Sequence, residues 1–275
     1  MGRLFYSLLA VISVYGGLVT LMFLFQRGLM YHPSANLMLP ADHGVPEMRQ
    51  VTLNTEDGLV LTAWYRPSKK GRHTLMFLHG NGGHIGHRSG KVKPYLNAGY
   101  GVLLVSYRGY GANPGTPTEE NLIKDGRAGL RFLKKIGVQI DQIVLYGESL
   151  GTGVATALAQ RKPVRALILE APFTSIADVS QHRYFYLPAR YLVKDRFDSA
   201  ERITRLQAPL LIIHGEKDRV VPWKFGRALF DLAPEPKSFL SMPNASHNNL
   251  YEFGVASKVI DFITKNKDRP LNNRL

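Results

Sequence analysis

Beyond its first 50 residues, the chain alternates short apolar runs with helix-length segments. Six of these short apolar runs are consistent with strands that are buried on both faces of a parallel sheet. They lie at residues 74–78, 101–106, 142–146, 165–169, 210–213 and 238–242. Helices are predicted between them at 117–135, 150–161 and 223–232. This alternation predicts an α/β fold with a mainly parallel, doubly wound sheet.

Two earlier runs, at 50–54 and 59–65, flank the turn residues Glu56, Asp57 and Gly58. Runs of strand length on either side of a short turn that contains glycine are typical of a β-hairpin. The predicted sheet therefore begins with an antiparallel hairpin.

The N-terminal segment has a different pattern. Residues 4–25 carry no charged side chain, and as a helix they would span about 33 Å, which matches the hydrocarbon core of a bilayer. A buried core helix and a cleaved signal peptide are the alternatives, but the run is longer than the apolar part of a typical signal peptide and no small-residue cleavage site follows it. We predict a transmembrane anchor at residues 1–27, a linker at 28–48 and a globular domain at 49–275.

Residues 172–206 form a long stretch between two predicted strands. A plain crossover needs fewer residues, so the stretch predicts an inserted cap over the carboxyl edge of the sheet. Its aromatic residues at 184–186 lie near several basic residues, and two interpretations stay open. Either the cap faces anionic lipid and admits acyl chains from a bilayer, or the aromatic side chains pack the cap onto the domain.

The charge of the chain favours an anionic partner. The formal net charge is +14, and of the basic residues only Arg3 and Arg27 lie within the first 30 positions. The excess therefore belongs to the predicted globular domain, where it is dispersed and no nucleic-acid-binding motif accompanies it. We predict an anionic membrane surface rather than nucleic acid as the partner, with a solvated basic surface as the alternative.

The residues beside the apolar run bear on orientation. Arg3 precedes the run, and Arg27, His32 and His43 follow it. We predict a cytosolic N-terminus, which places the globular domain on the non-cytosolic side of the membrane.

The chain contains no cysteine, which excludes disulfides, zinc-thiolate sites and thiol nucleophiles.

The first chemical motif is Gly147-Glu148-Ser149-Leu150-Gly151, which follows a predicted strand and opens a predicted helix. A G-x-S-x-G nucleophile elbow requires this context, because the glycines permit a tight turn that exposes the serine hydroxyl above the sheet. A serine between glycines is otherwise often a loop or helix-cap residue. From its context we predict that Ser149 is a nucleophile.

A serine hydroxyl needs a base to activate it, and that base is itself held by an acid. In a strand-turn-helix elbow, the acid and then the histidine follow the nucleophile in the chain. Asp218 comes shortly after the run at 210–213, and His247 shortly after the run at 238–242. Both lie at the carboxyl ends of predicted parallel strands, where open α/β sheets place their sites. We therefore predict a triad of Ser149, His247 and Asp218.

A glycine-rich turn, His79-Gly80-Asn81-Gly82-Gly83, follows the run at 74–78. Glycines in this place let backbone N–H groups face a reacting carbonyl, so we predict an oxyanion hole formed by the N–H groups of Asn81 and Leu150. A phosphate-binding loop is the alternative, but the Lys-Ser/Thr ending of a P-loop is missing. No cofactor is predicted.

Other polar residues are assigned structural roles or set aside. Arg108 and Glu170 are predicted to form ion pairs or hydrogen bonds inside the fold. His84 and His87 have the spacing of two metal ligands. Since no third ligand is evident nearby, no metal site is predicted.

Asp195 and Asp198 are rivals for the acid of the triad. Neither follows a predicted strand as Asp218 does. We predict that they pair with Arg196 or Arg202 instead.

Several ordered motifs carry a resemblance to a known family. They are His79-Gly80-Asn81, Ser106-Tyr107-Arg108-Gly109-Tyr110-Gly111, Pro117-Thr118-Glu119, Gly147-Glu148-Ser149-Leu150-Gly151, Glu170-Ala171-Pro172-Phe173-Thr174 and Lys194-Asp195-Arg196-Phe197-Asp198. Over residues 50–265 the chain resembles the α/β-hydrolase superfamily, and within it the Bem46-like or ABHD13/ABHD17-like group. The resemblance implies a hydrolase fold with an N-terminal hydrophobic anchor, which agrees with the run at 4–25. The chain lacks the N-terminal cysteine cluster of the ABHD17 depalmitoylases, so no protein-depalmitoylating role is carried over.

Together these features predict a membrane-anchored serine hydrolase that cleaves ester or thioester bonds of acyl or lipid-like substrates through an acyl-enzyme. A catalytically idle membrane scaffold of the same fold and a serine peptidase are the alternatives. The joint presence of Ser149, Asp218 and His247 favours an enzyme. Epoxide and haloalkane hydrolases are disfavoured because they carry a carboxylate at the elbow.

Overall fold

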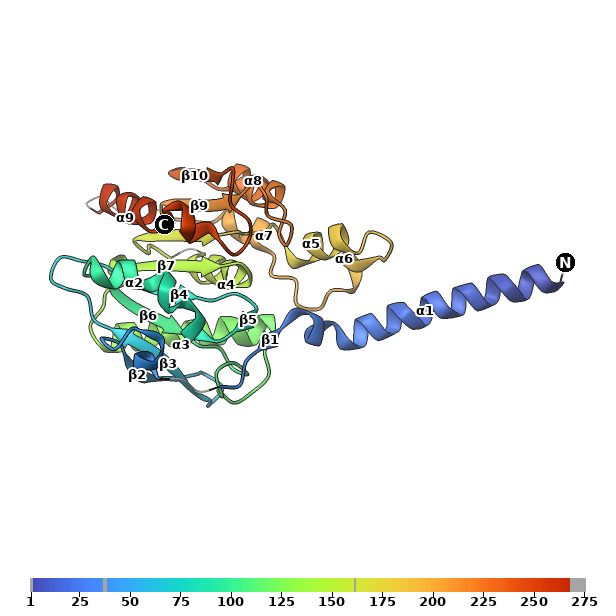
Figure 1. The fold of residues 1–275 in the computed structure, drawn as a ribbon, viewed down its shortest axis with the longest axis horizontal. Coiled ribbons are helices and arrows are strands. Elements are labelled where there is room, and N and C mark those ends of the chain that lie inside the picture. Colours follow the sequence, from blue (N-terminus) through green and yellow to red (C-terminus); the bar gives the residue numbers. More distant parts are fainter. Residues whose placement is uncertain (1, 37–38, 161, 268–275) are drawn as a thin grey trace.

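The computed structural model describes residues 2–36, 39–160 and 162–267 (Figure 1). The strands are β1 (His32–Pro33), β2 (Arg49–Asn54), β3 (Val60–Arg66), β4 (Thr74–Leu78), β5 (Gly82–Gly83), β6 (Gly101–Val105), β7 (Ile143–Glu148), β8 (Ala166–Glu170), β9 (Leu210–Gly215) and β10 (Lys237–Met242). The helices are α1 (Gly2–Met30), α2 (Ser89–Asn97), α3 (Glu119–Lys135), α4 (Leu150–Ala159), α5 (Ile176–Arg183), α6 (Ala189–Leu192), α7 (Ser199–Ile203), α8 (Trp223–Leu232) and α9 (Val255–Lys265). Parts of four predicted segments lie outside the described residues. These are residue 1 of the anchor, residues 37–38 of the linker, residue 161 of the helix predicted at 150–161, and residues 268–275 of the globular domain.

Eight strands form one sheet in the order β10-β9-β8-β7-β4-β6-β3-β2. The hairpin partners β2 and β3 are antiparallel, as are β3 and β6, and the remaining neighbours are parallel. Each strand predicted from an apolar run is present, with ends shifted by two residues at most. The predicted fold class and the predicted hairpin are therefore confirmed.

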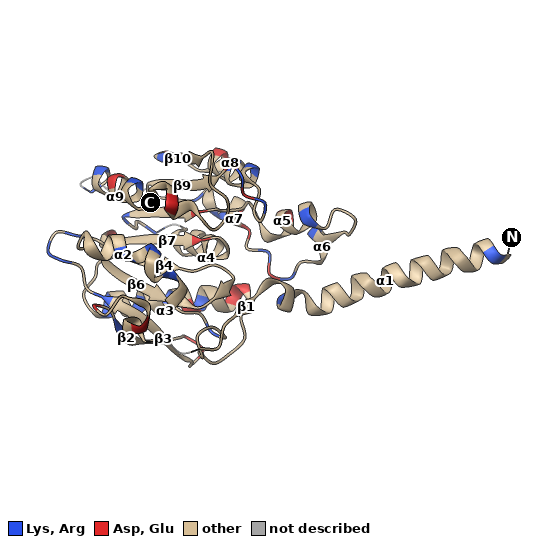
Figure 2. Ribbon diagram, in the orientation of Figure 1, with Lys and Arg blue, Asp and Glu red and all other residues tan. Residues whose placement is uncertain are grey.

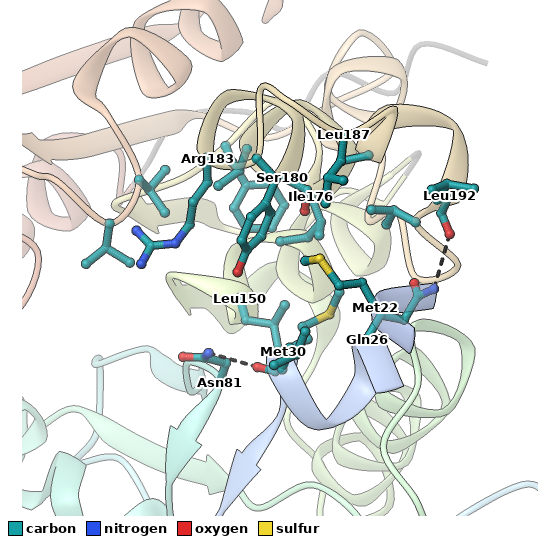
Figure 3. A pocket seen from close by; sticks show the side chains of 18 of the residues that line it. Met22, Gln26, Met30, Asn81, Leu150, Ile176, Ser180, Arg183, Leu187 and Leu192 are labelled. Carbon is teal, nitrogen blue, oxygen red and sulfur yellow. Dashed lines mark hydrogen bonds between the residues drawn. The ribbon is translucent and has the colours of Figure 1, made fainter. Parts of the chain in front are cut away.

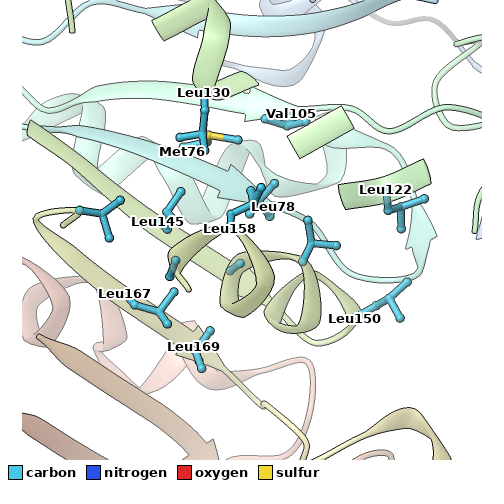
Figure 4. Packing of buried hydrophobic residues seen from close by; sticks show 14 of the residues in the cluster. Met76, Leu78, Val105, Leu122, Leu130, Leu145, Leu150, Leu158, Leu167 and Leu169 are labelled. Carbon is cyan, nitrogen blue, oxygen red and sulfur yellow. The ribbon is translucent and has the colours of Figure 1, made fainter. Parts of the chain in front are cut away.

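Both faces of the sheet are covered by helices, which explains the mainly apolar runs of the central strands, whereas the edge strand β10 is only partly buried. Side chains alternate along β4: Met76 and Leu78 belong to one hydrophobic cluster, and Leu75 and Phe77 to the other. Helices α3, α4 and α8 contribute to the first cluster, part of which is drawn in Figure 4, and α2 and α9 contribute to the second. The sheet thus has two cores, and its carboxyl edge is left for the loops.

Two covering helices were not predicted. Helix α9 buries Val255, Val259 and Ile263, a spacing of four that is a helical stripe and was available in the sequence. Helix α2 contains Gly90 and Pro94 within nine residues, and both residue types lower the apparent helical propensity. Its burial of apolar side chains against the sheet outweighs that cost.

Helix α1 projects from the body of the protein, and its last turns lie beside α6 (Figure 1). It has 29 residues, none of them buried, and it is long and apolar enough to cross a membrane. Figure 2 shows Lys and Arg spread over the body but only near the two ends of α1.

The chain turns from α1 directly into β1. This two-residue strand pairs in parallel with β5, with His32 opposite Gly82 and Pro33 opposite Gly83. The pairing joins the end of α1 to the glycine-rich turn that follows β4. It was not predicted, because two residues carry no recognisable strand pattern.

Residues 172–206 contain the short helices α5, α6 and α7. The predicted pairing of Asp195 with Arg196 or Arg202 is wrong. Asp195 Oδ2 lies 2.9 Å from Nε of Arg27, at the end of α1, and Arg202 pairs with Glu119 at 2.6 Å. The reason is spatial, since α1 and α3 approach this segment from distant parts of the chain.

Asp198 is likewise paired differently from the prediction. Its Oδ1 accepts a hydrogen bond from the N–H of Glu201, 3.4 Å away, so the side chain caps the first turn of α7. A short acidic side chain at the start of a helix satisfies an otherwise unpaired N–H. Asp198 therefore bonds to a backbone group three residues away instead of forming the predicted ion pair.

The predicted ion pairing of Arg108 is confirmed. Its Nη2 lies 2.6 Å from Oδ1 of Asp125 on α3, and its Nη1 lies 2.7 Å from Oδ2 of Asp57 in the hairpin turn. Asp125 is fully buried and also accepts the backbone N–H of Arg108. Close to Arg108, the Tyr110 hydroxyl donates to the carbonyl of Asn81. The ion pairs therefore hold a loop that supports the glycine-rich turn.

Replacement of Asp125 by alanine should destabilise the protein by about 3–5 kcal/mol, because it leaves the Arg108 guanidinium buried beside a single remaining carboxylate. Urea unfolding of the full chain in detergent, followed by circular dichroism, measures the change. Glu120→Ala is the matched control, since Glu120 pairs with Lys124 on the exposed face of the same helix, and it should leave the midpoint unchanged. Equal midpoints for the two variants would contradict the role given to Asp125.

Candidate active site

Ser149 stands at the sharp turn between β7 and α4. Its backbone has φ +49° and ψ −116°, a left-handed conformation that is strained for a residue with a side chain. The turn is held by a hydrogen bond from the N–H of Ser149 to the carbonyl of Glu170, 2.8 Å away, at the end of β8. The predicted strand-turn-helix context of Ser149 is therefore present.

Two glycines permit this turn because neighbouring backbone comes too close for a side chain. A Cβ atom on Gly151 would lie 2.0 Å from the carbonyl oxygen of Leu78, and one on Gly147 would lie 2.6 Å from Cα of Thr152. Both separations are far below van der Waals contact. The first turn of α4 thus crosses directly over the end of β4, which brings Ser149 beside the glycine-rich turn.

The structure brings Ser149, His247 and Asp218 together. Oγ of Ser149 lies 3.0 Å from Nε2 of His247, and Nδ1 of His247 lies 2.7 Å from Oδ2 of Asp218. The carboxylate can only accept, so Nδ1 donates to it and Nε2 is left to accept the proton of the serine hydroxyl. This arrangement can transfer a proton from the serine to the imidazole.

The Asp218 carboxylate is buried but well satisfied. Its Oδ1 accepts the N–H groups of Val220 and Val221, each 2.8 Å away. Burial alone would raise the pKa of Asp218, but hydrogen bonds from His214, His247 and the backbone of Val221 outweigh it and hold that pKa well below its usual range. Asp218 is therefore a carboxylate that stays charged beside His247.

His214 is a site residue that the sequence analysis missed. Its Nε2 lies 2.8 Å from the carbonyl of Val221 and 3.3 Å from Oδ2 of Asp218. Both neighbours are acceptors, so Nε2 carries the proton, and the imidazole helps to fix the loop that bears Asp218. The signal in the sequence was a polar residue four positions before Asp218, directly after an apolar run.

Asn81 and Leu150 both lie in the wall of the pocket that contains Ser149 (Figure 3). The carbonyl of Asn81 accepts from His32 N–H at 2.9 Å, and its side-chain amide donates to the carbonyl of Met30 at 2.9 Å. Within the described residues, the backbone N–H groups of Asn81 and Leu150 have no acceptor. Two unpaired donors close to a serine hydroxyl are what an oxyanion hole requires.

A chain of ion pairs lies beneath the turn. Glu148 contacts Arg88 Nε at 2.9 Å and Lys91 Nζ at 3.0 Å, and Lys91 Nζ also lies 2.6 Å from Oε1 of Glu170. Burial would raise the pKa of Glu148, but the charges of Lys91 and Arg88 outweigh it and lower that pKa. The predicted buried pairing of Glu170 is confirmed. Glu148, which precedes Ser149, and Glu170, whose carbonyl accepts the Ser149 N–H, are thus both held by Lys91.

The pocket in front of Ser149 has a volume of about 420 Å³, within the range of small-molecule sites. Its wall is formed by α1, by α5 and α6, and by the loop that carries Val220 and Val221. Most of the lining side chains are apolar. Among the described residues, no cluster of three His, Asp or Glu side chains has the geometry of a metal site.

Comparison with known proteins places this chain in a family. A family with the alpha/beta hydrolase fold matches residues 73–200. A Mycobacterium tuberculosis protein is 38% identical over 87% of this chain and 86% of its own length. Protein bem46 of Schizosaccharomyces pombe is 32% identical over 95% of this chain and 93% of its own length.

Two further similarities were found, one in sequence and one in structure. A Danio rerio protein named lysophosphatidylserine lipase ABHD12 is 33% identical over 74% of this chain and 63% of its own length. The structure of the Pyrococcus furiosus esterase Pf2001 superposes with a TM-score of 0.71 and 22% identity, covering 86% of this chain and 98% of that one. The chain belongs to the Bem46-like group of the alpha/beta hydrolase fold family.

Proposed function

We propose that the protein is a membrane-anchored serine hydrolase that cleaves carboxylic ester or thioester bonds of acyl or lipid-like substrates. The observation that carries the proposal is the continuous contact from Ser149 Oγ through the His247 imidazole to the Asp218 carboxylate at the floor of an apolar pocket. The order and contacts of the three residues are those that a serine–histidine–aspartate triad requires.

In the proposed mechanism, Ser149 Oγ attacks the carbonyl carbon while Nε2 of His247 takes its proton. Asp218 stabilises the resulting imidazolium through Nδ1. The carbonyl oxygen becomes an oxyanion, which the N–H groups of Asn81 and Leu150 stabilise. Collapse expels the alcohol or thiol, which receives the proton from His247, and leaves an acyl group on Ser149. A water molecule, activated by His247, then releases the acid and restores the serine.

The apolar pocket wall supports a substrate with an acyl chain rather than a small polar ester. The relative from Danio rerio, which is named a lipase, supports the same substrate class. We further propose that residues 172–206 form a cap over the site and that residues 1–27 anchor the protein in a bilayer, with 28–48 as the linker to a catalytic domain at 49–275.

We also propose that an anionic membrane surface attracts the basic body of the protein. In the 172–206 segment, Arg190 pairs with Asp178 and Arg202 pairs with Glu119. Lys194 instead lies over the ring of Phe23 in α1. Among the described residues of this segment, Arg183, Lys194 and Arg196 are exposed and have no ion pair with a carboxylate, so these are the cations that we propose meet lipid headgroups.

Ser149→Ala should lower kcat/KM on p-nitrophenyl butyrate by at least about 10³-fold, because the nucleophile is lost. Labelling by a fluorophosphonate probe should disappear at the same time. The control is Ser257→Ala, because Ser257 is an exposed serine on α9. This variant should retain both ester hydrolysis and labelling by the probe. Full hydrolysis by Ser149→Ala would end the proposal. Absence of labelling in the unaltered protein would favour the idle scaffold.

Asp218→Asn should lower kcat by about 10³-fold or more, since the neutral amide cannot stabilise the imidazolium. The low pKa of Asp218 in the folded state gives this loss a particular pH dependence. Its stabilising charge is complete above the unfolded pKa of about 3.9 and is lost only as pH falls towards the lower folded pKa. Above about pH 8, where an ordinary histidine with a pKa near 6.5 is neutral, the ratio of wild-type to Asp218→Asn activity should therefore be constant with pH.

A pH–rate series for both enzymes measures this ratio. Asp231→Asn, which removes an exposed carboxylate paired with Arg227, is the matched control and should behave as wild type. A ratio that changes steadily over the same pH range would show that Asp218 titrates there and would contradict the assignment.

We propose a cytosolic N-terminus and a catalytic domain on the non-cytosolic side, because Arg3 precedes the apolar helix. Alkaline phosphatase fused to the C-terminus, which is active only outside the cytosol, should then be active. Green fluorescent protein fused to the same position should be dark if exported unfolded. The opposite pair of results would reverse the orientation without affecting the triad.

A further inference from the structure

The anchor helix supplies one wall of the pocket that contains Ser149. Val19, Met22, Phe23, Leu29 and Met30 of α1 line it. The facing wall comes from α5 and α6 (Figure 3), and Ser149, Leu150 and Asn81 also line the cavity. Figure 3 shows Met22 and Met30 facing Ile176 and Leu187 across the space. The cavity is therefore a groove between the membrane helix and the 172–206 segment.

The polar side chain of Gln26, which also lines the groove, has its hydrogen-bonding groups satisfied by the facing segment. Gln26 donates from Nε2 to the carbonyl of Leu192 at 3.2 Å and accepts at Oε1 from the N–H of Lys194 at 2.7 Å. Among the described lining residues, Arg183 is the one Lys, Arg, Asp or Glu side chain, and it is exposed. The interior of the groove is thus uncharged and suits a hydrocarbon chain.

The helix is fastened to the body at several points. Arg27 forms its two-point ion pair with Asp195, the Tyr15 hydroxyl donates to the carbonyl of Tyr186 at 2.9 Å, and Asn81 donates to Met30. These contacts fix the spacing between α1 and the opposite wall. The groove is consequently a built feature of the fold.

The groove also lies at the depth of a membrane interface. A helix of 29 residues is about 43 Å long, which exceeds the roughly 30 Å hydrocarbon core of a bilayer. The excess of about 13 Å corresponds to roughly nine residues, so α1 from Met22 onwards reaches the membrane interface, and the groove continues past it along Val19 into the hydrocarbon core. Beside the last turns of α1, Phe185, Tyr186 and Tyr191 are 79%, 53% and 84% exposed, so these aromatics do not pack the segment onto the domain. Exposed aromatic rings of this kind favour the headgroup region.

We propose that the groove between α1 and the α5–α6 segment is an acyl-binding site, into which the chain of an ester lipid passes sideways from the bilayer to reach Ser149. The anchor helix is then part of the substrate site as well as a tether. The proposal rests on the proposed function, because it takes Ser149 as the residue that meets the ester carbonyl.

Met22→Trp tests the groove from the α1 side, because the indole would fill the space between Met22 and Ile176. The variant is assayed as full-length protein reconstituted in nanodiscs. The ratio of kcat/KM for p-nitrophenyl hexadecanoate to kcat/KM for p-nitrophenyl acetate should fall at least tenfold. Leu24→Trp is the matched control: Leu24 is 60% exposed and is not a lining residue. It should leave the ratio within twofold of wild type.

A second measurement does not depend on turnover. Ser149→Ala protein in nanodiscs is irradiated with a lysophospholipid whose palmitoyl chain ends in a diazirine, and the cross-linked peptides are mapped by mass spectrometry. Leu150 and Phe173 line the groove and are 3% and 1% exposed, so bulk lipid cannot reach them. Cross-links to these two residues should form, and should fall at least fivefold when Met22→Trp is added but not when Leu24→Trp is added.

The outcomes separate the two proposals. Unlabelled Leu150 and Phe173, or equal effects of Met22→Trp and Leu24→Trp, would overturn the groove while leaving Ser149-dependent ester hydrolysis standing. Hydrolysis of acetyl esters that survives Ser149→Ala would overturn the proposed nucleophile, whatever the lipid labels.

Discussion

The crossing of α4 over the end of β4 is the constraint on which the whole site depends. At this point the backbone of Gly151 approaches the carbonyl of Leu78 so closely that no side chain fits between them. Because the glycine-rich turn begins one residue after Leu78, the same crossing places Asn81 next to Ser149. The buried carboxylates of Glu148 and Glu170, joined by Lys91, hold this crossing from below. A strained serine conformation can persist only where its surroundings fix it in this way.

Much of this arrangement was predictable because the parallel sheet converts sequence order into position. Ser149, Asp218 and His247 each follow an apolar run, and the carboxyl ends of parallel strands meet at one edge. His214 was missed although it directly follows the run at 210–213, because a triad needs one acid and one base and His247 already supplied the base. The partner of Asp195 was predicted wrongly for a different reason: Arg27 lies far away in sequence, and the nearer arginines were chosen. Local patterns specify elements, whereas contacts between distant elements depend on the assembled fold.

The polar residues near the end of α1 show how this long apolar helix is joined to a folded body. Gln26 and Arg27 would be costly in hydrocarbon, where unsatisfied polar groups have no water to bind. Here both are satisfied by the 172–206 segment, through Leu192, Lys194 and Asp195. If α1 is the proposed anchor, these contacts set how far it can enter a bilayer before its polar groups lose their partners. They would therefore limit the depth at which the body sits.

That limit extends to the proposed oxyanion loop, because α1 continues into β1 without a break. The carbonyl of Met30 accepts from the Asn81 side chain, and the N–H groups of His32 and Ser34 donate to the carbonyls of Asn81 and Gly83. A shift of α1 against the body would displace these residues together. Donors to an oxyanion must be held within about 0.5 Å of their working position. The position of α1 and the geometry of the Asn81 N–H are thus mechanically linked, and the same helix forms the wall along which, in our proposal, an acyl chain would reach Ser149.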